Sequence, residues 1–138
     1  MCYGLFLFSK NEISKENYSK KRIFLMDMKV NTNKNLTNTY PYTYLITNQF
    51  CSCDLVQPAA LSAKLEDKQR REELLDLLEE MKASVPSFAL LTHSFQGYFD
   101  EELVEIKAVK KMDRVDNAFV ESLHPDTLYK VVNYLWKG

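Results

Sequence analysis

The sequence predicts an α+β fold: a mainly antiparallel sheet of five to six strands, one long central helix and a C-terminal helix. Short apolar segments, which are typical of strands, recur at 2–9, 22–30, 42–50, 87–94 and 102–110. A longer segment, 59–84, carries leucines on one side of a helix and stops before Pro86. Strands before and after this helix can form one sheet with the helices on one side.

The first strand, 2–9, is expected in the middle of the sheet because both of its alternating faces are apolar. One face carries Cys2, Gly4, Phe6 and Phe8, and the other carries Tyr3, Leu5 and Leu7. The second strand, 22–30, has a partly wet face near its end. The Asn- and Thr-rich tract 31–39 follows it, and we expect a mobile surface loop there because such side chains bond to local backbone.

The second half of the chain carries the long helix and the remaining strands. The helix is expected to bury Leu61, Leu65, Leu74, Leu75, Leu78 and Met81, while its charged turns 66–73 project into solvent or meet a partner. Segments 87–94 and 102–110 are expected to pair as an antiparallel hairpin around Gly97. Segment 118–123 reads as a short strand. His124, Pro125 and Asp126 then open a helix that buries Leu128, Val131, Val132 and Leu135.

Length and charge narrow the function classes. The 138 residues suit one domain, 1–138, and the net charge of −1 argues against a nucleic-acid partner or a polybasic membrane contact. Basic residues at 20–22 and 110–111, with Tyr40, Tyr42 and Tyr44, could offer a stacking surface for a single strand, but the balanced charge disfavours it. We find no export signal and no membrane-spanning stretch, and we therefore expect a cytoplasmic protein with reduced thiols.

The three cysteines are the most chemically specific feature. Cys51 and Cys53 form a Cys-x-Cys pair, and Cys2 lies in the first strand. A structural zinc site needs four ligands, so His93 or Asp54 would have to complete the set. The alternatives are that the thiols are small buried apolar side chains, or that they are redox-active or nucleophilic.

Cys2 also permits an N-terminal nucleophile. If Met1 is removed, the free amine and the thiol belong to the same residue, and the amine can act as the base for the thiol. The opening Met-Cys-Tyr-Gly resembles the Met-Cys-Gly-Ile start of class II glutamine amidotransferases, although Tyr3 stands where that family has glycine. The resemblance covers about four residues and would imply amide hydrolysis at Cys2.

A broader resemblance is to a group of small uncharacterised bacterial proteins. These proteins open with Met-Cys-x-x-Leu-aromatic and carry a second Cys-x-Cys segment after a central strand. The matching segments here are MCYGLFLFS, YTYLITNQFCSCDL, the leucine-rich helix and SFALLTHSFQG. The resemblance implies no reaction, but it implies that Cys2, Cys51 and Cys53 form one cluster.

The remaining motifs favour binding over catalysis. The chain has three glycines and no phosphate-binding loop, and Asp100, Glu101 and Glu102 form an acidic run that is typical of a solvated loop. Phe95, Tyr98 and Phe99 crowd one turn, where they could anchor a protein partner. We therefore expect a non-enzymatic binding or interaction domain that meets a protein partner or a second copy. The alternatives are the thiol site, with zinc as its ligand or with redox activity, and the Cys2 amide hydrolase.

Overall fold

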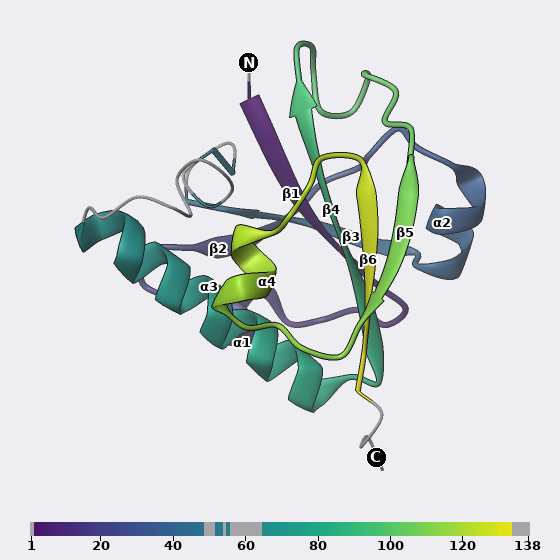
Figure 1. Cartoon of the computed structure of the whole chain (residues 1–138). Coiled ribbons are helices and arrows are strands. Elements are labelled where there is room, and N and C mark those ends of the chain that lie inside the picture. Colours follow the sequence, from purple (N-terminus) through teal and green to yellow (C-terminus); the bar gives the residue numbers. More distant parts are fainter. Residues whose placement is uncertain (1, 49–51, 54, 56–64, 134–138) are drawn as a thin grey trace.

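A computed structural model describes residues 2–48, 52–53, 55 and 65–133 (Figure 1). Short strands precede one long helix, and further strands follow it. In chain order the elements are β1 (Cys2–Ser9), α1 (Lys15–Tyr18), β2 (Phe24–Asp27), α2 (Lys34–Thr39), β3 (Tyr42–Thr47), α3 (Leu65–Ser84), β4 (Ser87–Phe95), β5 (Ala108–Met112), α4 (Asn117–Glu121) and β6 (Thr127–Val132).

Within the described residues, six strands form one sheet in the order β2-β3-β1-β4-β6-β5. Four of the neighbouring pairs are antiparallel, and β5 runs parallel to β6. The expected α+β class and the long helix are confirmed, whereas the sheet is mixed. β1 lies in the interior of the sheet, as its two apolar faces predict.

Each face of the sheet carries its own apolar cluster, and burying one large apolar side chain contributes roughly 1.5 to 3 kcal/mol. The first cluster joins Leu5, Leu7 and Leu90 to α3 and α4. The second joins Phe6, Phe8 and Leu91 to Leu36 of α2 and to the segment between β4 and β5. The helices therefore cover both faces, because α2 lies opposite α3 and α4, and the expectation of helices on one side is wrong.

The expected C-terminal helix is wrong where the structure describes it: residues 127–132 form β6. Leu128 belongs to the second cluster and Val131 to the first, so this strand buries both faces. A strand that is apolar on both sides also presents apolar residues three and four positions apart, which imitates a helical stripe. Leu135, the last residue of the expected stripe, lies outside the described residues.

The expected hairpin between 87–94 and 102–110 is also wrong. β4 forms between β1 and β6, which occupy both of its sides. The chain after β4 crosses the second face, where Val104 N–H donates to the carbonyl of Asn31 at 2.8 Å and Thr32 Oγ1 donates to the carbonyl of Val104 at 2.8 Å. The strand then begins only at Ala108 and pairs with β6.

Two shorter segments and one side chain of α3 differ from expectation. The tract 31–39, expected as a loop, contains α2, where the Asn33 side chain caps the first turn and Leu36 is buried. Segment 118–123, expected as a strand, overlaps α4, whose N-cap is Asp116. In α3, Leu74, Leu78 and Met81 are buried as predicted, but Leu65 is 70% exposed. Residues 59–64 of the expected helix lie outside the described residues. No described helix is both long and apolar enough to cross a membrane.

Candidate functional site

The candidate site lies at the end of β4, on the face of the second cluster. His93 pairs with Gly4 of β1, and its ring packs edge-on against Phe95 with ring centres 4.6 Å apart. A Cβ on Gly4 would lie 2.6 and 2.7 Å from two atoms of the Phe6 ring. Glycine is therefore required for the Phe6 ring to lie across β1 at this point.

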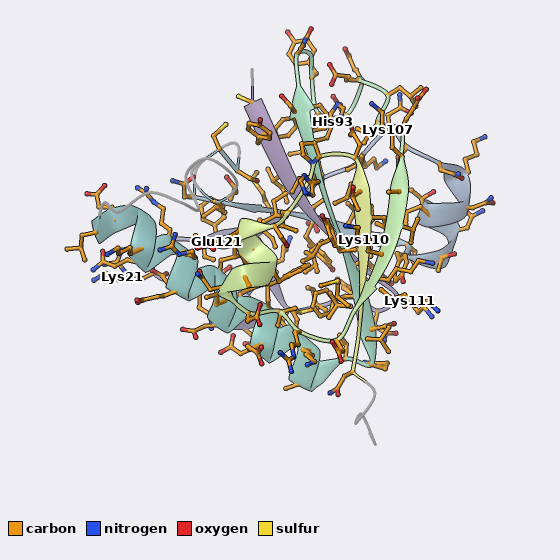
Figure 2. All side chains as sticks on the ribbon, in the orientation of Figure 1. Lys21, His93, Lys107, Lys110, Lys111 and Glu121 are labelled. Carbon is orange, nitrogen blue, oxygen red and sulfur yellow. The ribbon has the colours of Figure 1, made fainter. Side chains whose placement is uncertain are left out.

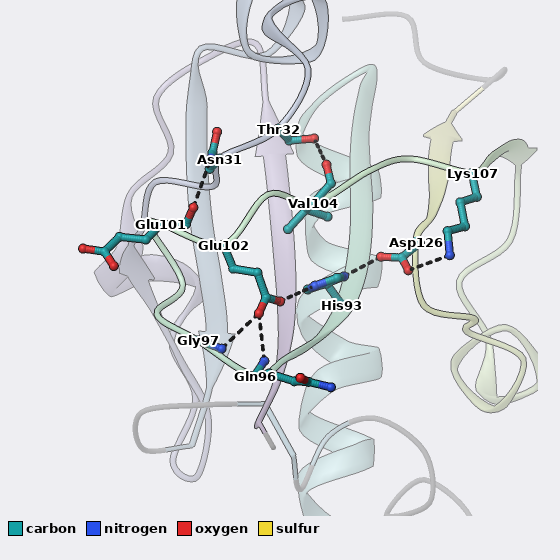
Figure 3. A network of polar contacts seen from close by, with 10 residues as sticks. All are labelled: Asn31, Thr32, His93, Gln96, Gly97, Glu101, Glu102, Val104, Lys107 and Asp126. Carbon is teal, nitrogen blue, oxygen red and sulfur yellow. Dashed lines mark hydrogen bonds and ion pairs between the residues drawn. The ribbon is translucent and has the colours of Figure 1, made fainter.

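His93 bridges two carboxylates (Figure 3). Its Nε2 lies 2.6 Å from Glu102 Oε2, and its Nδ1 lies 2.5 Å from Asp126 Oδ1. The three side chains are 15 to 25% exposed. Each ring nitrogen of His93 thus faces a carboxylate oxygen at hydrogen-bonding distance, and the ring is held between the two acidic side chains. Glu102, His93 and Asp126 are called the histidine network below.

Glu102 also fixes the turn after β4. Its Oε1 accepts hydrogen bonds from the backbone N–H groups of Gln96 and Gly97, each at 3.0 Å. The hydrogen bond from His93 lowers the pKa of Glu102, and these backbone N–H groups lower it further. The glutamate is therefore held as a carboxylate that closes the turn.

Asp126 connects the network to β6. Its φ is 63°, in the left-handed region that aspartate tolerates better than most residues. Its N–H donates to the carbonyl of Thr92, and its carbonyl accepts from Lys107 N–H, both at 2.8 Å. Lys107 Nζ lies 4.0 Å from Asp126 Oδ2. Through Asp126, the network joins β4, the start of β6 and the chain that leads into β5.

This geometry suits a structural clamp. Both ring nitrogens of His93 already face carboxylate oxygens, so the imidazole presents neither nitrogen to a metal ion or a substrate in this arrangement. Among the described residues, no group of three or more His, Cys, Asp or Glu side chains is arranged to hold a metal ion. The network instead fixes the chain from Gln96 to Lys107 across the sheet.

The described thiols lie near the start of β1. Cys2 is exposed and pairs with Phe95, and the sulfur of Cys53 accepts a hydrogen bond from Tyr3 N–H at 3.2 Å. Cys51 and Asp54 lie outside the described residues. Two of the three cysteines are thus close along β1, because Cys53 contacts the residue that follows Cys2.

Ser52, which sequence reasoning missed, positions Cys53. Ser52 is fully buried. Its Oγ accepts a hydrogen bond from Leu5 N–H at 2.9 Å and donates one to the carbonyl of Ile46 at 2.5 Å. Its N–H donates to the carbonyl of Tyr3 at 2.8 Å. Ser52 and Cys53 therefore bond the first residues of β1, whereas β3 pairs with β1 only from Phe6 onward.

The three aromatic residues that the sequence proposed for interaction separate in the structure. Phe95 is fully buried and Phe99 is half-buried, and their rings pack together at 4.4 Å in the second cluster. Tyr98 is 75% exposed. Of this group, Tyr98 is the residue whose ring faces solvent.

Further apolar side chains are exposed beyond Tyr98, and sequence reasoning missed them. The described residues contain five exposed large apolar side chains, and Tyr98, Leu103 and Val109 are three of them. Leu103 borders a hollow of about 400 Å³, and Val109 borders one of about 330 Å³. The two hollows share Asn33 and Ile106, so they adjoin between α2 and β5.

The sequence placed Glu102 and Asp126 in patterns that are typical of other roles. Glu102 stood in an acidic run typical of solvated loops, and Asp126 followed Pro125 at an expected helix start. Neither pattern identifies a partner for His93, because the three residues are brought together only by the crossing after β4. Comparison of the chain with protein-family models, curated proteins and solved structures found no match.

Proposed function

We propose that the chain is a non-enzymatic protein-binding domain. Its contact surface is the exposed side of Tyr98, Leu103, Ile106 and Val109, called the 98–109 surface below. The observation that carries the proposal is that three of the five exposed large apolar side chains of the described residues belong to this one segment. Burying such a side chain in an interface returns roughly 1.5 to 3 kcal/mol, so a partner gains from covering it.

The histidine network supports this proposal because it fixes the backbone that carries the surface. Glu102 and Asp126 attach both ends of the crossing segment to His93 of β4. A segment that is ordered before binding loses less conformational entropy when a partner arrives. The same hydrogen bonds occupy the histidine, which favours a structural role for it over acid–base catalysis.

Selection from a library of random linear peptides displayed on phage, against the immobilised chain, tests the proposal. The affinities of the selected peptides are then measured by calorimetry with two double variants. Leu103→Ser with Val109→Ser removes the 98–109 surface, and Tyr42→Ser with Leu65→Ser removes exposed apolar side chains elsewhere. We expect the first variant to weaken binding about tenfold or more, and the second to change it less than about twofold.

Two outcomes contradict the proposal. One is a selection that yields no peptide whose binding is measurable by calorimetry. The other is equal weakening by both double variants, because that result would mean that the 98–109 surface has no special role. Circular dichroism of each variant verifies that the fold is retained, as expected for exposed positions.

A further inference from the structure

β5 is an edge strand that remains open among the described residues. It is the last strand of the sheet, and four of its five residues are exposed. The opposite edge, β2, is partly covered by the chain before it, since Ser19 Oγ accepts from Leu25 N–H at 3.4 Å and Lys20 N–H donates to the carbonyl of Ile23 at 2.7 Å. The outward N–H and C=O groups of β5 are a template on which an extended chain can pair.

The hollow of about 330 Å³ that Val109 borders lies beside this edge, and polar side chains line it together with apolar ones. Its apolar lining comes from Leu36, Tyr40, Ile106, Val109 and Leu128. Val109 pairs with Leu128 of β6, so the two side chains share the face of the second cluster. A strand added outside β5 would lie about 4.8 Å away, and every second side chain would point to the same face as Val109.

Positive charge surrounds this edge. Lys107 precedes β5, Lys110 and Lys111 belong to it, and Lys111 pairs with Lys130 of β6. Figure 2 shows Lys107, Lys110 and Lys111 along the side of the molecule that carries β5, with Lys21 on the opposite side. Among the described residues, Lys110, Lys111 and Lys130 form no ion pair. A partner with carboxylates would meet cations that are not yet neutralised.

We infer that β5 binds an extended acidic peptide segment of a protein partner by strand addition, with an apolar side chain of the peptide beside Val109. This inference rests on the proposed protein-binding function and names the chemistry of the partner. The backbone hydrogen bonds would supply affinity that does not depend on sequence. With the apolar residues of the peptide on the face of Val109, its alternate carboxylates would lie on the face of Lys110, so Lys110 and the hollow would select acidic segments with alternating apolar residues.

A second copy of the chain fits this edge poorly. A two-fold antiparallel pairing of two β5 strands about their middle residue would set Lys110 against Lys110 of the other copy. Like charges directly opposite each other destabilise a strand pair. Lysines on an edge strand also serve to prevent such pairing, and this role agrees with selection for an acidic partner.

Single-stranded nucleic acid is the other anionic ligand, and the described residues fit it less well. Stacking of bases requires exposed aromatic rings near the cations. Of the tyrosines that the sequence offered for stacking, Tyr40 and Tyr44 are buried, and Tyr42 is 38% exposed and lines a different hollow from the one beside β5. Tyr98 of the 98–109 surface is exposed, but stacking of successive bases needs more than one ring.

Calorimetry with two synthetic peptides tests the charge preference. One peptide alternates Glu with Val, and the other alternates Lys with Val. We expect the acidic peptide to bind at least about tenfold more tightly. The variant Lys110→Glu with Lys111→Glu should lose about tenfold in affinity for it, whereas Lys21→Glu with Lys68→Glu, the same charge change at exposed positions off β5, should change it less than about twofold.

Two N-methylated forms of the acidic peptide test strand addition. Methyl groups on alternate nitrogens remove the donors from one edge of an extended peptide and leave the other edge intact. We expect methylation of one edge to abolish binding and methylation of the other to preserve it. Binding of the unmodified peptide should also slow hydrogen exchange at alternate amides of β5.

Three results would overturn the inference. They are equal affinity for the acidic and the lysine peptides, equal tolerance of methylation on both edges, and tighter binding of oligo-dT than of the acidic peptide. If phage-selected peptides still depend on Leu103 and Val109 in any of these cases, the proposed function stands and only the partner chemistry is wrong. If the phage-selected peptides do not depend on Leu103 and Val109 either, both the proposed function and the partner chemistry are wrong.

Discussion

The carboxylate of Asp126 lies 2.5 Å from Nδ1 of His93, although the two residues are 33 positions apart in the chain. They meet where the chain that enters β6 lies beside the end of β4. The other ring nitrogen lies 2.6 Å from Glu102. Because Glu102 belongs to the 98–109 segment and the carbonyl of Asp126 accepts from Lys107 N–H, the histidine joins the end of β4 to the backbone that carries the 98–109 surface. This coupling has measurable consequences.

The variant Asp126→Asn should destabilise the protein by about 1 to 2 kcal/mol. Asparagine tolerates the left-handed backbone at this position, so the change removes the charge and leaves the conformation in place. Chemical denaturation measures the loss, and amide exchange at Gln96, Gly97 and Lys107 should become faster. The control Asp113→Asn alters an exposed aspartate and should stay within about 0.5 kcal/mol of the parent. Equal effects of both substitutions would contradict a role for the network.

Stability should fall in acid through Glu102. Hydrogen bonds from His93 and from two backbone N–H groups lower the pKa of Glu102 below its usual value of 4.5. The folded state therefore binds the proton less tightly than the unfolded state. The contribution of the Glu102 carboxylate to the free energy of unfolding is fully present above the unfolded pKa and is lost as the pH falls through the lower folded pKa. Melting temperatures of the parent and of Glu102→Gln should differ near neutral pH and converge in acid, once the pH lies below the lowered folded pKa of Glu102. A difference that persists unchanged in acid would exclude this carboxylate as the source.

The thiols should differ in reactivity. Cys2 is exposed, whereas Cys53 is half-buried and its sulfur accepts a hydrogen bond from Tyr3 N–H. We expect iodoacetamide to modify Cys2 first in the native protein, at a rate that a strong chelator leaves unchanged. A rate that rises with chelator, together with about one zinc per chain, would instead support the zinc site that the sequence suggested. Intact mass decides a related alternative, because a retained Met1 would exclude Cys2 as an N-terminal nucleophile.

Sequence reasoning located the elements that depend on local pattern. β1 and β4 are apolar on both faces, and α3 repeats leucine at helical spacing, so each was predicted close to its observed position. β6 was predicted as a helix because Leu128 and Val131 satisfy a helical stripe and also lie on opposite faces of a strand. Periodicity alone cannot separate these two cases in so short a segment.

The candidate site was harder to predict because it depends on strand order. Asp126 reaches His93 where the chain enters β6 beside β4, and Glu102 reaches it because the chain after β4 crosses the second face; no local pattern in the sequence indicates either arrangement. The strand expected over 102–110 begins only at Ala108, and Val109 within it is 55% exposed. The cluster of Cys2, Cys51 and Cys53 was expected from the resemblance to small uncharacterised bacterial proteins; Cys53 contacts Tyr3, the neighbour of Cys2, and Cys51 lies outside the described residues.

Gly4→Ala should destabilise the protein by about 1 to 3 kcal/mol. The added methyl group would lie 2.6 Å from the Phe6 ring and 3.0 Å from the Phe95 ring, and both rings are buried and packed edge to face. Gly97→Ala is the matched control, because a Cβ there meets its nearest atom at 3.6 Å and should cost less than about 0.5 kcal/mol.

Replacing the Phe6 ring with a smaller side chain offers a second measurement. Phe6→Leu alone should be destabilising. The double variant Gly4→Ala with Phe6→Leu should lose less stability than the sum of the two single losses, because the smaller side chain makes room for the methyl group. Strict additivity in the double-mutant cycle would show that Gly4 acts through something other than its contact with Phe6.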